Sequence, residues 1–182
     1  MAEGVRTKGL RFVLGGTRSG KSRFAEGLVE ASGLAPVYLA TGQAFDEEMT
    51  ARIAEHRERR VGLPLGRPWR TVEAPLDLVE AIGQEAREDR AILIDCLTLW
   101  VSNLMLAERD VEGQSRRLTE TLAARPPGLI VLVSNEVGLS IVPANAMARR
   151  FADHSGRLHQ MVAEACDHVT LIAAGLPLTL KG

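Results

Sequence analysis

The sequence has few aromatic residues, and its charges nearly cancel. Only four Phe, two Trp and one Tyr occur among 182 residues, and 22 Lys and Arg stand against 23 Asp and Glu, for a net charge of −1. Aromatic platforms for stacked bases are therefore not expected. A broad basic surface that would attract nucleic acid or anionic membranes is not expected either. The composition argues against a nucleic-acid partner.

Cysteine and long apolar segments are also scarce. Cys96 and Cys166 each lie in an apolar stretch without metal-ligand spacing, which predicts two core thiols. No run approaches the ~18 apolar residues of a membrane-spanning helix, and the polar segment 1–8, expected to be flexible, lacks a signal peptide's hydrophobic region. We expect a cytoplasmic protein without membrane insertion, forming one domain over residues 1–182.

Short apolar runs alternate with helix-length segments along the chain. The runs are Leu10 to Leu14, Val37 to Ala40, Ala91 to Ile94, Leu129 to Val133 and Val169 to Ala173. The helical segments are Lys21 to Glu30, Asp46 to Arg60, Leu76 to Arg87, Leu97 to Ala107, Gln114 to Ala124 and about Ala144 to Ala165. Continuous apolar runs suit strands buried on both faces of a parallel sheet. The alternation predicts an α/β fold.

Two segments are less regular. Val61 to Pro68 contains two Gly and two Pro, which predicts a mobile loop, followed by a short strand at Arg70 to Glu73. Near the end, Gly175-Leu176-Pro177 predicts a turn into a last edge strand at Leu178 to Leu180, with an antiparallel arrangement as one option.

The most specific local signal is a phosphate-binding loop. It reads Gly15-Gly16-Thr17-Arg18-Ser19-Gly20-Lys21-Ser22 and lies between an expected strand and an expected helix. The glycines let backbone amides turn toward a phosphate, and the helix adds its N-terminal partial charge. Lys21 is expected to contact the β and γ phosphates and Ser22 to bind Mg²⁺.

A second carboxylate for Mg²⁺ is expected at the end of another strand. Asp95 follows the apolar run at 91–94 and fits that position. Its alternative role is to cap the next helix, and both roles are compatible. A regulatory GTPase is not indicated, because the guanine-reading NKxD tetrapeptide and the DxxG segment are absent.

The expected helix at Asp46 to Arg60 has two interpretations. Arg52, His56 and Arg59 form a stripe along one edge of it. An imidazole between guanidinium groups is suited to attack phosphorus. The alternative is an ordinary surface helix with i,i+4 ion pairs such as Glu55 to Arg59, and spacing alone favours it.

Several motifs in series resemble one known family. They are the phosphate loop at 15–22, Ala40-Thr41-Gly42, Asp-x-Glu-Met-x-x-Arg-Ile-x-x-His-Arg at 46–57, Trp69-x-Thr71-x-Glu73-x-Pro75, and Ser134-Asn135-Glu136-Val137-Gly138 followed by Ile141-Val142-Pro143. Over about residues 10 to 181, the chain resembles the bifunctional adenosylcobinamide kinase / adenosylcobinamide-phosphate guanylyltransferase of cobalamin biosynthesis.

That resemblance implies a single RecA-like P-loop domain, with a mostly parallel sheet and helices on both faces, that acts on a corrinoid. A nucleoside triphosphate, ATP or GTP, first phosphorylates the side-chain hydroxyl of adenosylcobinamide. GTP then transfers GMP through a histidine, which His56 matches, to give adenosylcobinamide-GDP and pyrophosphate. The implied nucleotide contacts, besides the loop, are Ala40, Thr41, Gly42, Arg57, Glu58, Arg59, Arg60, Glu73 and Asp95. The resemblance also implies a homotrimer.

The chain departs from the family pattern at two positions. Family members often read Phe-Arg-Asp and later Asn-Gln where this chain has Ala152 and His159. Two other functions stay open from the residues themselves: a simple P-loop kinase of small molecules, and a RecA-like ATPase or nucleotide-dependent regulator. The neutral charge weighs against a DNA partner for the latter.

Overall fold

The computed structural model describes residues 8–43 and 68–182. The strands are β1 (Gly9–Gly15), β2 (Ala35–Ala40), β3 (Arg70–Glu73), β4 (Arg90–Asp95), β5 (Leu129–Asn135), β6 (His168–Ala173) and β7 (Leu176–Lys181). The helices of these ranges are α1 (Lys21–Ser32), α3 (Leu78–Glu85), α4 (Leu97–Leu106), α5 (Val111–Ala123) and α6 (Ala146–Ala165). The predicted alternation is confirmed, whereas the helix predicted at 46–60 and all but the last residue of the loop predicted at 61–68 lie outside the described residues.

The strands form one sheet in the order β3-β2-β4-β5-β1-β6-β7. The first six strands in this order, from β3 to β6, run parallel, and β7 pairs with β6 in the antiparallel direction. The predicted edge strand at the end of the chain is therefore confirmed, and it is antiparallel. Because the six parallel strands point the same way, their carboxyl ends share one edge of the sheet.

Three helices begin at other residues than predicted: α3 begins at Leu78 instead of Leu76, and capping side chains define the starts of α5 and α6. The Asp110 carboxylate accepts a hydrogen bond of 2.9 Å from Gly113 N, so α5 begins at Val111. The Asn145 side chain accepts bonds from Met147 N and Ala148 N, so α6 begins at Ala146. Boundaries of this kind depend on single caps more than on apolar periodicity.

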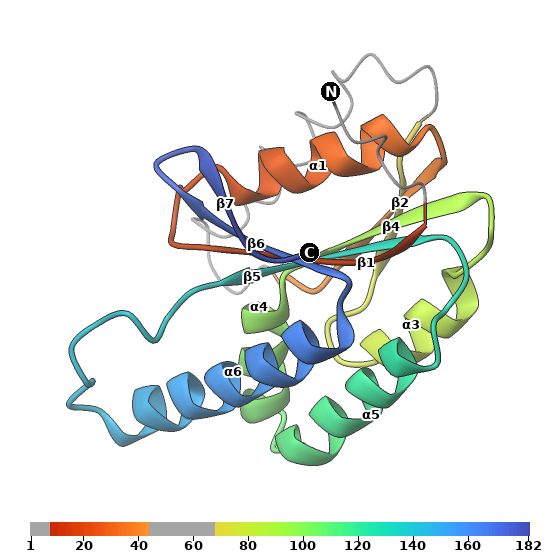
Figure 1. Ribbon diagram of the computed structural model, residues 1–182. Coiled ribbons are helices and arrows are strands. Elements are labelled where there is room, and N and C mark those ends of the chain that lie inside the picture. The colour runs from red at the N-terminus through yellow and green to blue at the C-terminus, as the bar shows by residue number, and fades with distance from the viewer. Residues whose placement is uncertain (1–7, 44–67) are drawn as a thin grey trace.

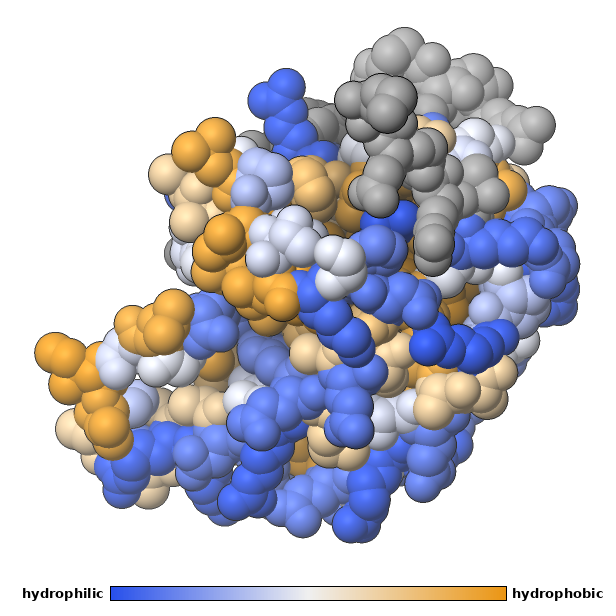
Figure 2. All heavy atoms as spheres, in the orientation of Figure 1, coloured by the Kyte–Doolittle hydropathy of each residue, from blue (hydrophilic) through white to orange (hydrophobic). Residues whose placement is uncertain are grey.

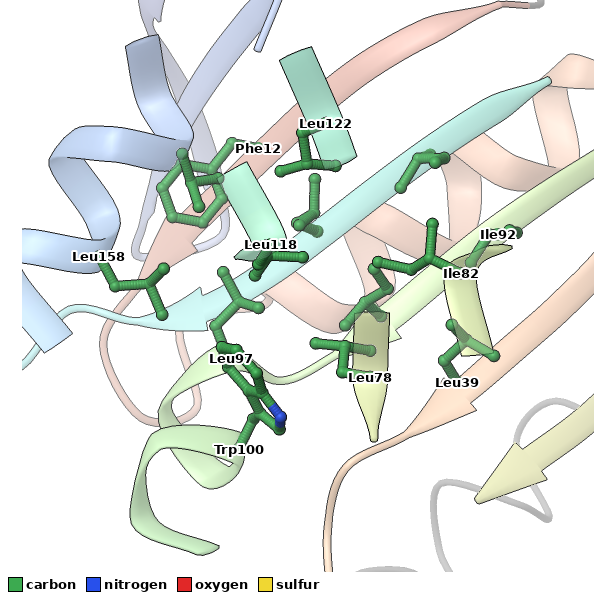
Figure 3. Packing of buried hydrophobic residues seen from close by; sticks show 14 of the residues in the cluster. Phe12, Leu39, Leu78, Ile82, Ile92, Leu97, Trp100, Leu118, Leu122 and Leu158 are labelled. Atoms are coloured by element: carbon green, nitrogen blue, oxygen red, sulfur yellow. The ribbon is translucent and has the colours of Figure 1, made fainter. Parts of the chain in front are cut away.

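The sheet is covered on both faces, as predicted. Among the described helices, α1 lies on one face and α3, α4, α5 and α6 lie on the other (Figure 1). Along β1, Phe12 points to the four-helix side and Val13 to the α1 side, and both are buried. The larger cluster contains Trp100 of α4 and Leu118 of α5 (Figure 3). This sandwich buries the central strands and leaves their carboxyl edge for ligands.

Both cysteines are free thiols, as predicted. Cys96 and Cys166 are buried, and they are not bonded to each other. Burial raises the pKa of Cys166 to about 12, so its thiol stays protonated. In the described parts of the chain, no helix combines the length and the apolar character needed to cross a lipid bilayer.

Candidate active site

The predicted phosphate loop links β1 to α1 at the carboxyl edge of the sheet. The backbone of the loop turns on itself through a hydrogen bond of 3.2 Å from Ser19 N to Gly16 O. Lys21 lies beneath the loop, 9% exposed, and its Nζ donates to Gly16 O at 3.1 Å. The exposed residues of the loop are Gly16, Thr17, Arg18 and Gly20. An accessible backbone loop with a lysine folded against it is suited to bind phosphate groups.

The start of α1 leaves donors for a ligand. Gly20 precedes the helix with φ 97°, a left-handed conformation that favours glycine. Within the described residues, no side chain caps the first turn of α1. The first amides of a helix lack partners inside the helix, and the dipole makes this end electropositive. The turn therefore offers backbone N–H groups to an anion at the place where the loop ends.

The hairpin between β6 and β7 supports the phosphate loop from outside. Gly175 N donates to Ser19 O at 2.9 Å, although the two residues are far apart in the sequence. Ala174 and Gly175 have φ of 51° and 79°, as a tight two-residue hairpin turn requires. A turn was predicted at Gly175 to Pro177, but it lies at Ala174 and Gly175, because Leu176 and Pro177 already pair in β7. The conformation of the loop is thus fixed partly by the last hairpin.

Three other predicted site residues meet at the same edge. Glu73 of β3 is in register with Ala40 of β2, and Ala40 is in register with Asp95 of β4. On the other side of the sheet, Gly15 is in register with Asn135 at the end of β5. The predicted nucleotide residues of four segments therefore lie along one line, from β3 to the phosphate loop.

The charges of Lys21 and Asp95 act on one buried thiol. The pKa of Cys96 is raised to about 11, first by burial and then by the negative charge of Asp95. The positive charge of Lys21 opposes this rise in the pKa. The charges of the loop lysine and of the strand-end carboxylate thus both reach the Cys96 thiol.

The residues at this edge have the chemistry that Mg²⁺ prefers. Ser22 offers a hydroxyl from the first turn of α1, and Asp95 offers a carboxylate, both only partly exposed. The helix packs against β1, β5 and β4, and β4 is the strand that ends at Asp95. Mg²⁺ binds few protein oxygens together with substrate phosphates. The donor set thus fits Mg²⁺ bound with a nucleotide, and the described residues contain no cluster of three or more metal-binding side chains.

Thr41 joins the ends of β2 and β4. The residue is fully buried, and its Oγ1 donates to Cys96 O at 2.7 Å and accepts from Cys96 N at 2.7 Å. Its backbone N–H donates to Asp95 O at 3.3 Å. Its side chain is thus engaged inside the protein. The predicted contact of Thr41 with a nucleotide stays a prediction, and its evident role is to hold Ala40 and Gly42 beside Asp95.

Asn103 of α4 holds the segments that follow β2 and β3. The side chain is buried, and Nδ2 donates to Thr41 O at 2.7 Å and to Pro75 O at 3.0 Å. One turn earlier, Trp100 Nε1 donates to Leu76 O at 2.9 Å. Two side chains of one helix therefore fix both segments at the edge of the candidate site. Neither residue was predicted to have a role in the site.

Replacing Asn103 with leucine is expected to destabilise the fold by about 2–4 kcal/mol, because the carbonyls of Thr41 and Pro75 lose their donor while buried. Leucine has a similar volume, so the packing changes little. The free energy of unfolding from urea denaturation measures the effect. Ser102→Ala on the same helix is the control and is expected to cost less than about 0.5 kcal/mol. Equal stabilities of the two variants would contradict the assigned role of Asn103.

Known proteins of one family are similar to this chain over most of its length. The family model described as cobinamide kinase / cobinamide phosphate guanyltransferase matches residues 11–180. The chain belongs to this family. A bifunctional adenosylcobalamin biosynthesis protein CobP of Pseudomonas aeruginosa is 51% identical over 172 residues, which cover 93% of this chain and 96% of that protein. A CobU of Salmonella typhimurium is 41% identical, covering 93% and 98% of the two chains.

Solved structures confirm the fold. The flagellar accessory protein FlaH of Methanocaldococcus jannaschii superposes with a TM-score of 0.57 at 12% identity, covering 96% of this chain and 79% of FlaH. The RadB recombinase superposes with a TM-score of 0.52 at 16% identity, covering 91% of this chain and 74% of RadB. At such identities the likeness concerns the fold alone, and it supports the RecA-like P-loop architecture predicted above.

The two departures from the family pattern lie on α6. Ala152 is half-buried, near the beginning of this helix. His159 is buried, and its Nε2 shares a hydrogen bond of 2.7 Å with Ser134 Oγ at the end of β5. Its ring also contacts Phe12, with ring centroids 5.7 Å apart. His159 is therefore a buried core residue with a hydrogen-bond partner, and it packs against the end of β5 next to the family motif at 134–138.

The stability of the protein is expected to depend on His159 at mildly acidic pH. Burial lowers the pKa of His159, and the negative charge of Glu136 only partly opposes this shift. Below about pH 6.5 the unfolded chain binds a proton that folded His159 does not, so stability falls by up to about 1.4 kcal/mol per pH unit. The loss continues until the pH reaches the pKa of the folded state.

Urea denaturation of the wild type and of His159→Asn between pH 5 and 7.5 measures this effect. The asparagine restores the residue that family members often have and cannot titrate. We expect the difference in unfolding free energy between the two proteins to change with pH. Parallel curves would show that His159 does not contribute.

Several predicted site residues lie outside the described residues. These are His56, Arg57, Glu58, Arg59 and Arg60, all in the segment 44–67. The structure describes the phosphate loop, Ala40 to Gly42, Glu73 and Asp95, and it brings these together at one edge. The parts of the site that sequence reasoning missed are Asn103, Trp100 and the Gly175 contact. Their hydrogen bonds are long-range, so no local motif marks them.

Proposed function

We propose that this chain phosphorylates adenosylcobinamide and then transfers GMP from GTP to the product, giving adenosylcobinamide-GDP and pyrophosphate. The observation that carries this is the family match over residues 11–180, together with a phosphate loop that has Asp95 and Glu73 on the same edge. Mg²⁺ bound by Ser22 and Asp95 would supply charge neutralisation at the phosphates. The free buried thiols agree with the cytoplasm as the compartment.

The residues of the edge suit both reactions. Backbone amides of the loop and Lys21 stabilise the negative charge that develops on phosphate oxygens. In the first reaction an alcohol attacks the γ phosphorus and a nucleoside diphosphate leaves. In the second reaction a nucleophile attacks the α phosphorus of GTP and pyrophosphate leaves. One triphosphate site can therefore serve both, provided that a different nucleophile approaches each phosphorus atom.

His56 is the nucleophile that we propose for the second reaction. It matches the guanylylated histidine of the family, and the four residues that follow it are proposed to contact the guanine nucleotide with Glu73. A histidine–GMP bond divides the transfer into two displacements, which predicts ping-pong kinetics for this half of the activity. This role is a proposal from sequence, since His56 lies outside the described residues.

The test combines the purified protein with Mg²⁺, cobinamide in its adenosylated form, and GTP or ATP. Mass spectrometry of the small molecules is expected to show cobinamide phosphate first and the GDP derivative with GTP only. Mass spectrometry of the protein, incubated with GTP alone, is expected to show an added GMP. Phosphorylation without any GMP adduct or GDP derivative would indicate a simple kinase. Phosphate release without a modified corrinoid would indicate an ATPase or regulator.

We further propose a homotrimer, as the family resemblance implies. The connection between β5 and α6 carries large apolar side chains that are almost fully exposed, with Ile141 at 93% and Leu139 at 85%. Figure 2 shows apolar groups protruding on the left side of the view, where Figure 1 places this connection and the β6–β7 hairpin. Exposed apolar patches of this kind mark interaction surfaces. The connection begins beside the phosphate loop, so a neighbouring copy seated on it would lie next to the active site.

Dilution is expected to lower the activity before it unfolds the protein. Light scattering measures the mass, and the same samples are assayed for phosphorylation of cobinamide. Ile141→Asp is expected to shift the protein to monomers, because a charge replaces an exposed apolar contact, and to lower the specific activity. An equally active monomer would overturn the proposal that the oligomer completes the site.

A further inference from the structure

The end of β5 lies where the reacting phosphate must be. In the sheet, β5 separates β1, which leads into the phosphate loop, from β4, which ends at Asp95. Given the function proposed above, a triphosphate contacts both the loop and the Asp95 side of the edge. Such a ligand has to pass over the carboxyl end of β5. The residues that follow this strand are therefore the nearest neighbours of its terminal phosphate.

Glu136 is the first residue after β5, and its backbone is bonded to the phosphate loop. Glu136 N donates to Gly15 O at 3.0 Å. The next residue of the loop, Gly16, accepts the bond from Lys21 Nζ with its carbonyl. Glu136 is thus fixed one residue away from the carbonyl that holds the phosphate-binding lysine, and no domain movement is needed to bring it there.

The carboxylate of Glu136 is held in one orientation. Its Oε1 accepts a hydrogen bond of 2.5 Å from Gly138 N. In the described part of the chain, the side chain forms no other hydrogen bond, so the second oxygen keeps its accepting capacity. A Cβ at Gly138 would lie 3.1 Å from Oε1, closer than ordinary contacts. A side chain larger than glycine at 138 would therefore shift this carboxylate by a few tenths of an ångström.

The neighbouring polar residues at this edge are committed to other roles. Asn135 Nδ2 donates to Thr98 Oγ1 at 2.9 Å, so this side chain is turned to α4. Asp95 lies at the end of the next strand and is the carboxylate suited to the metal. Glu73 is farther away, because β4 and β2 lie between β5 and β3. Of these carboxylates, Glu136 is the one on the segment that is bonded to the phosphate loop.

We propose that Glu136 is the general base of the phosphorylation step. Its carboxylate accepts the proton of the attacking alcohol, while the alcohol oxygen forms a bond to the γ phosphorus. The bond between this phosphorus and the oxygen that bridges to the β phosphate breaks, and the nucleoside diphosphate leaves with that electron pair. The protonated carboxyl group then returns its proton to water. Transfer of GMP to a histidine involves no alcohol proton, so this step does not use Glu136.

Glu136→Gln separates these functions. Glutamine keeps the acceptor for Gly138 N and the shape of the side chain, but it does not act as a base. We expect kcat for cobinamide phosphorylation to fall by about 10²–10⁴-fold. The KM for cobinamide is expected to stay within about twofold, since binding is retained. The Kd for a fluorescent GTP analogue and the amount of GMP bound to the protein are expected to match the wild type.

Three further variants complete the experiment. Gly138→Ala moves the carboxylate without removing it and is expected to lower kcat by about tenfold. Glu120→Gln, an exposed change on α5, is the control and is expected to leave kcat unchanged. Thermal melting shows whether each variant is folded. If Glu136→Gln is unfolded, the single variants Gly138→Ala and Glu136→Asp test the role of Glu136 in its place. Wild-type rates in folded Glu136 and Gly138 variants would overturn the role of Glu136. A wild type that does not phosphorylate cobinamide would instead overturn the proposed function.

Discussion

Replacing Lys21 with alanine is expected to reduce cobinamide phosphorylation by about 10³-fold or more, because the cation that faces the β and γ phosphates is lost. The same change is expected to suppress guanylylation of the protein, since GTP occupies the same loop. Lys21 is one of three lysines in the sequence, beside Lys8 and Lys181. Its Nζ donates to Gly16 O at 3.1 Å. Urea denaturation of Lys21→Ala shows whether the lost activity is accompanied by a loss of stability.

Lys181→Ala is the matched control for this prediction. Lys181 Nζ also donates to backbone carbonyls, those of Ala163 and Glu164 at 2.9 and 2.8 Å, at the end of α6. A cation there stabilises the helix terminus, so its loss is expected to cost about 1 kcal/mol of stability. Steady-state rates and urea denaturation are measured on both variants. The roles of the two lysines would be refuted if Lys181→Ala lost activity and Lys21→Ala kept it.

The main elements of the fold were predictable because their signals are local. Each central strand is a continuous apolar run, such as Leu129 to Val133, and each lies buried on both faces of the sheet. The phosphate loop is a contiguous motif between a strand and a helix, so its position followed from sequence. Asp95 followed from its place at the end of an apolar run. Parallel strands then brought these residues to one edge without further information.

The parts of the site that were not predicted depend on contacts between distant residues. Asn103 and Thr41 are 62 positions apart, and Ser134 and His159 are 25 apart. Nothing in the local sequence distinguishes a buried asparagine that bonds two carbonyls from one on the surface of a helix. The same holds for Gly175, whose contact with Ser19 depends on β6 lying next to β1. These contacts fix the position of the motif residues, and only the three-dimensional arrangement reveals them.

The order of the strands explains how one small domain can offer two reaction centres. The phosphate loop and Glu136 lie at the ends of β1 and β5, whereas Ala40 and Glu73 lie at the ends of β2 and β3. A nucleotide bound along this edge would have its phosphates near the first pair and its guanosine near the second. An alcohol at β5 then reaches the γ phosphorus. A nucleophile for the α phosphorus has to approach from elsewhere, and His56 is the residue that we propose for this.

Replacing His56 with alanine is expected to abolish the covalent GMP adduct completely, because no other group then attacks the α phosphorus of GTP. Phosphorylation of cobinamide is expected to stay within about threefold of the wild type, since it uses the loop and Glu136 instead. The adduct is measured with GTP labelled at the α phosphate. A histidine–phosphorus bond is expected to be labile in acid and stable in alkali, which distinguishes it from a serine ester.

Two of the three remaining histidines provide the controls for this result. His154 is half-buried on α6, and His159 is bonded to Ser134, so His154→Ala and His159→Asn are expected to keep the full label. A label that survives in His56→Ala would place the nucleophile elsewhere. Loss of both the label and the kinase activity would mean that His56 supports the whole nucleotide site rather than one displacement. Loss of the label alone would mean that two different nucleophiles attack one triphosphate. These are the corrinoid alcohol, activated by Glu136 beside the phosphate loop, and His56.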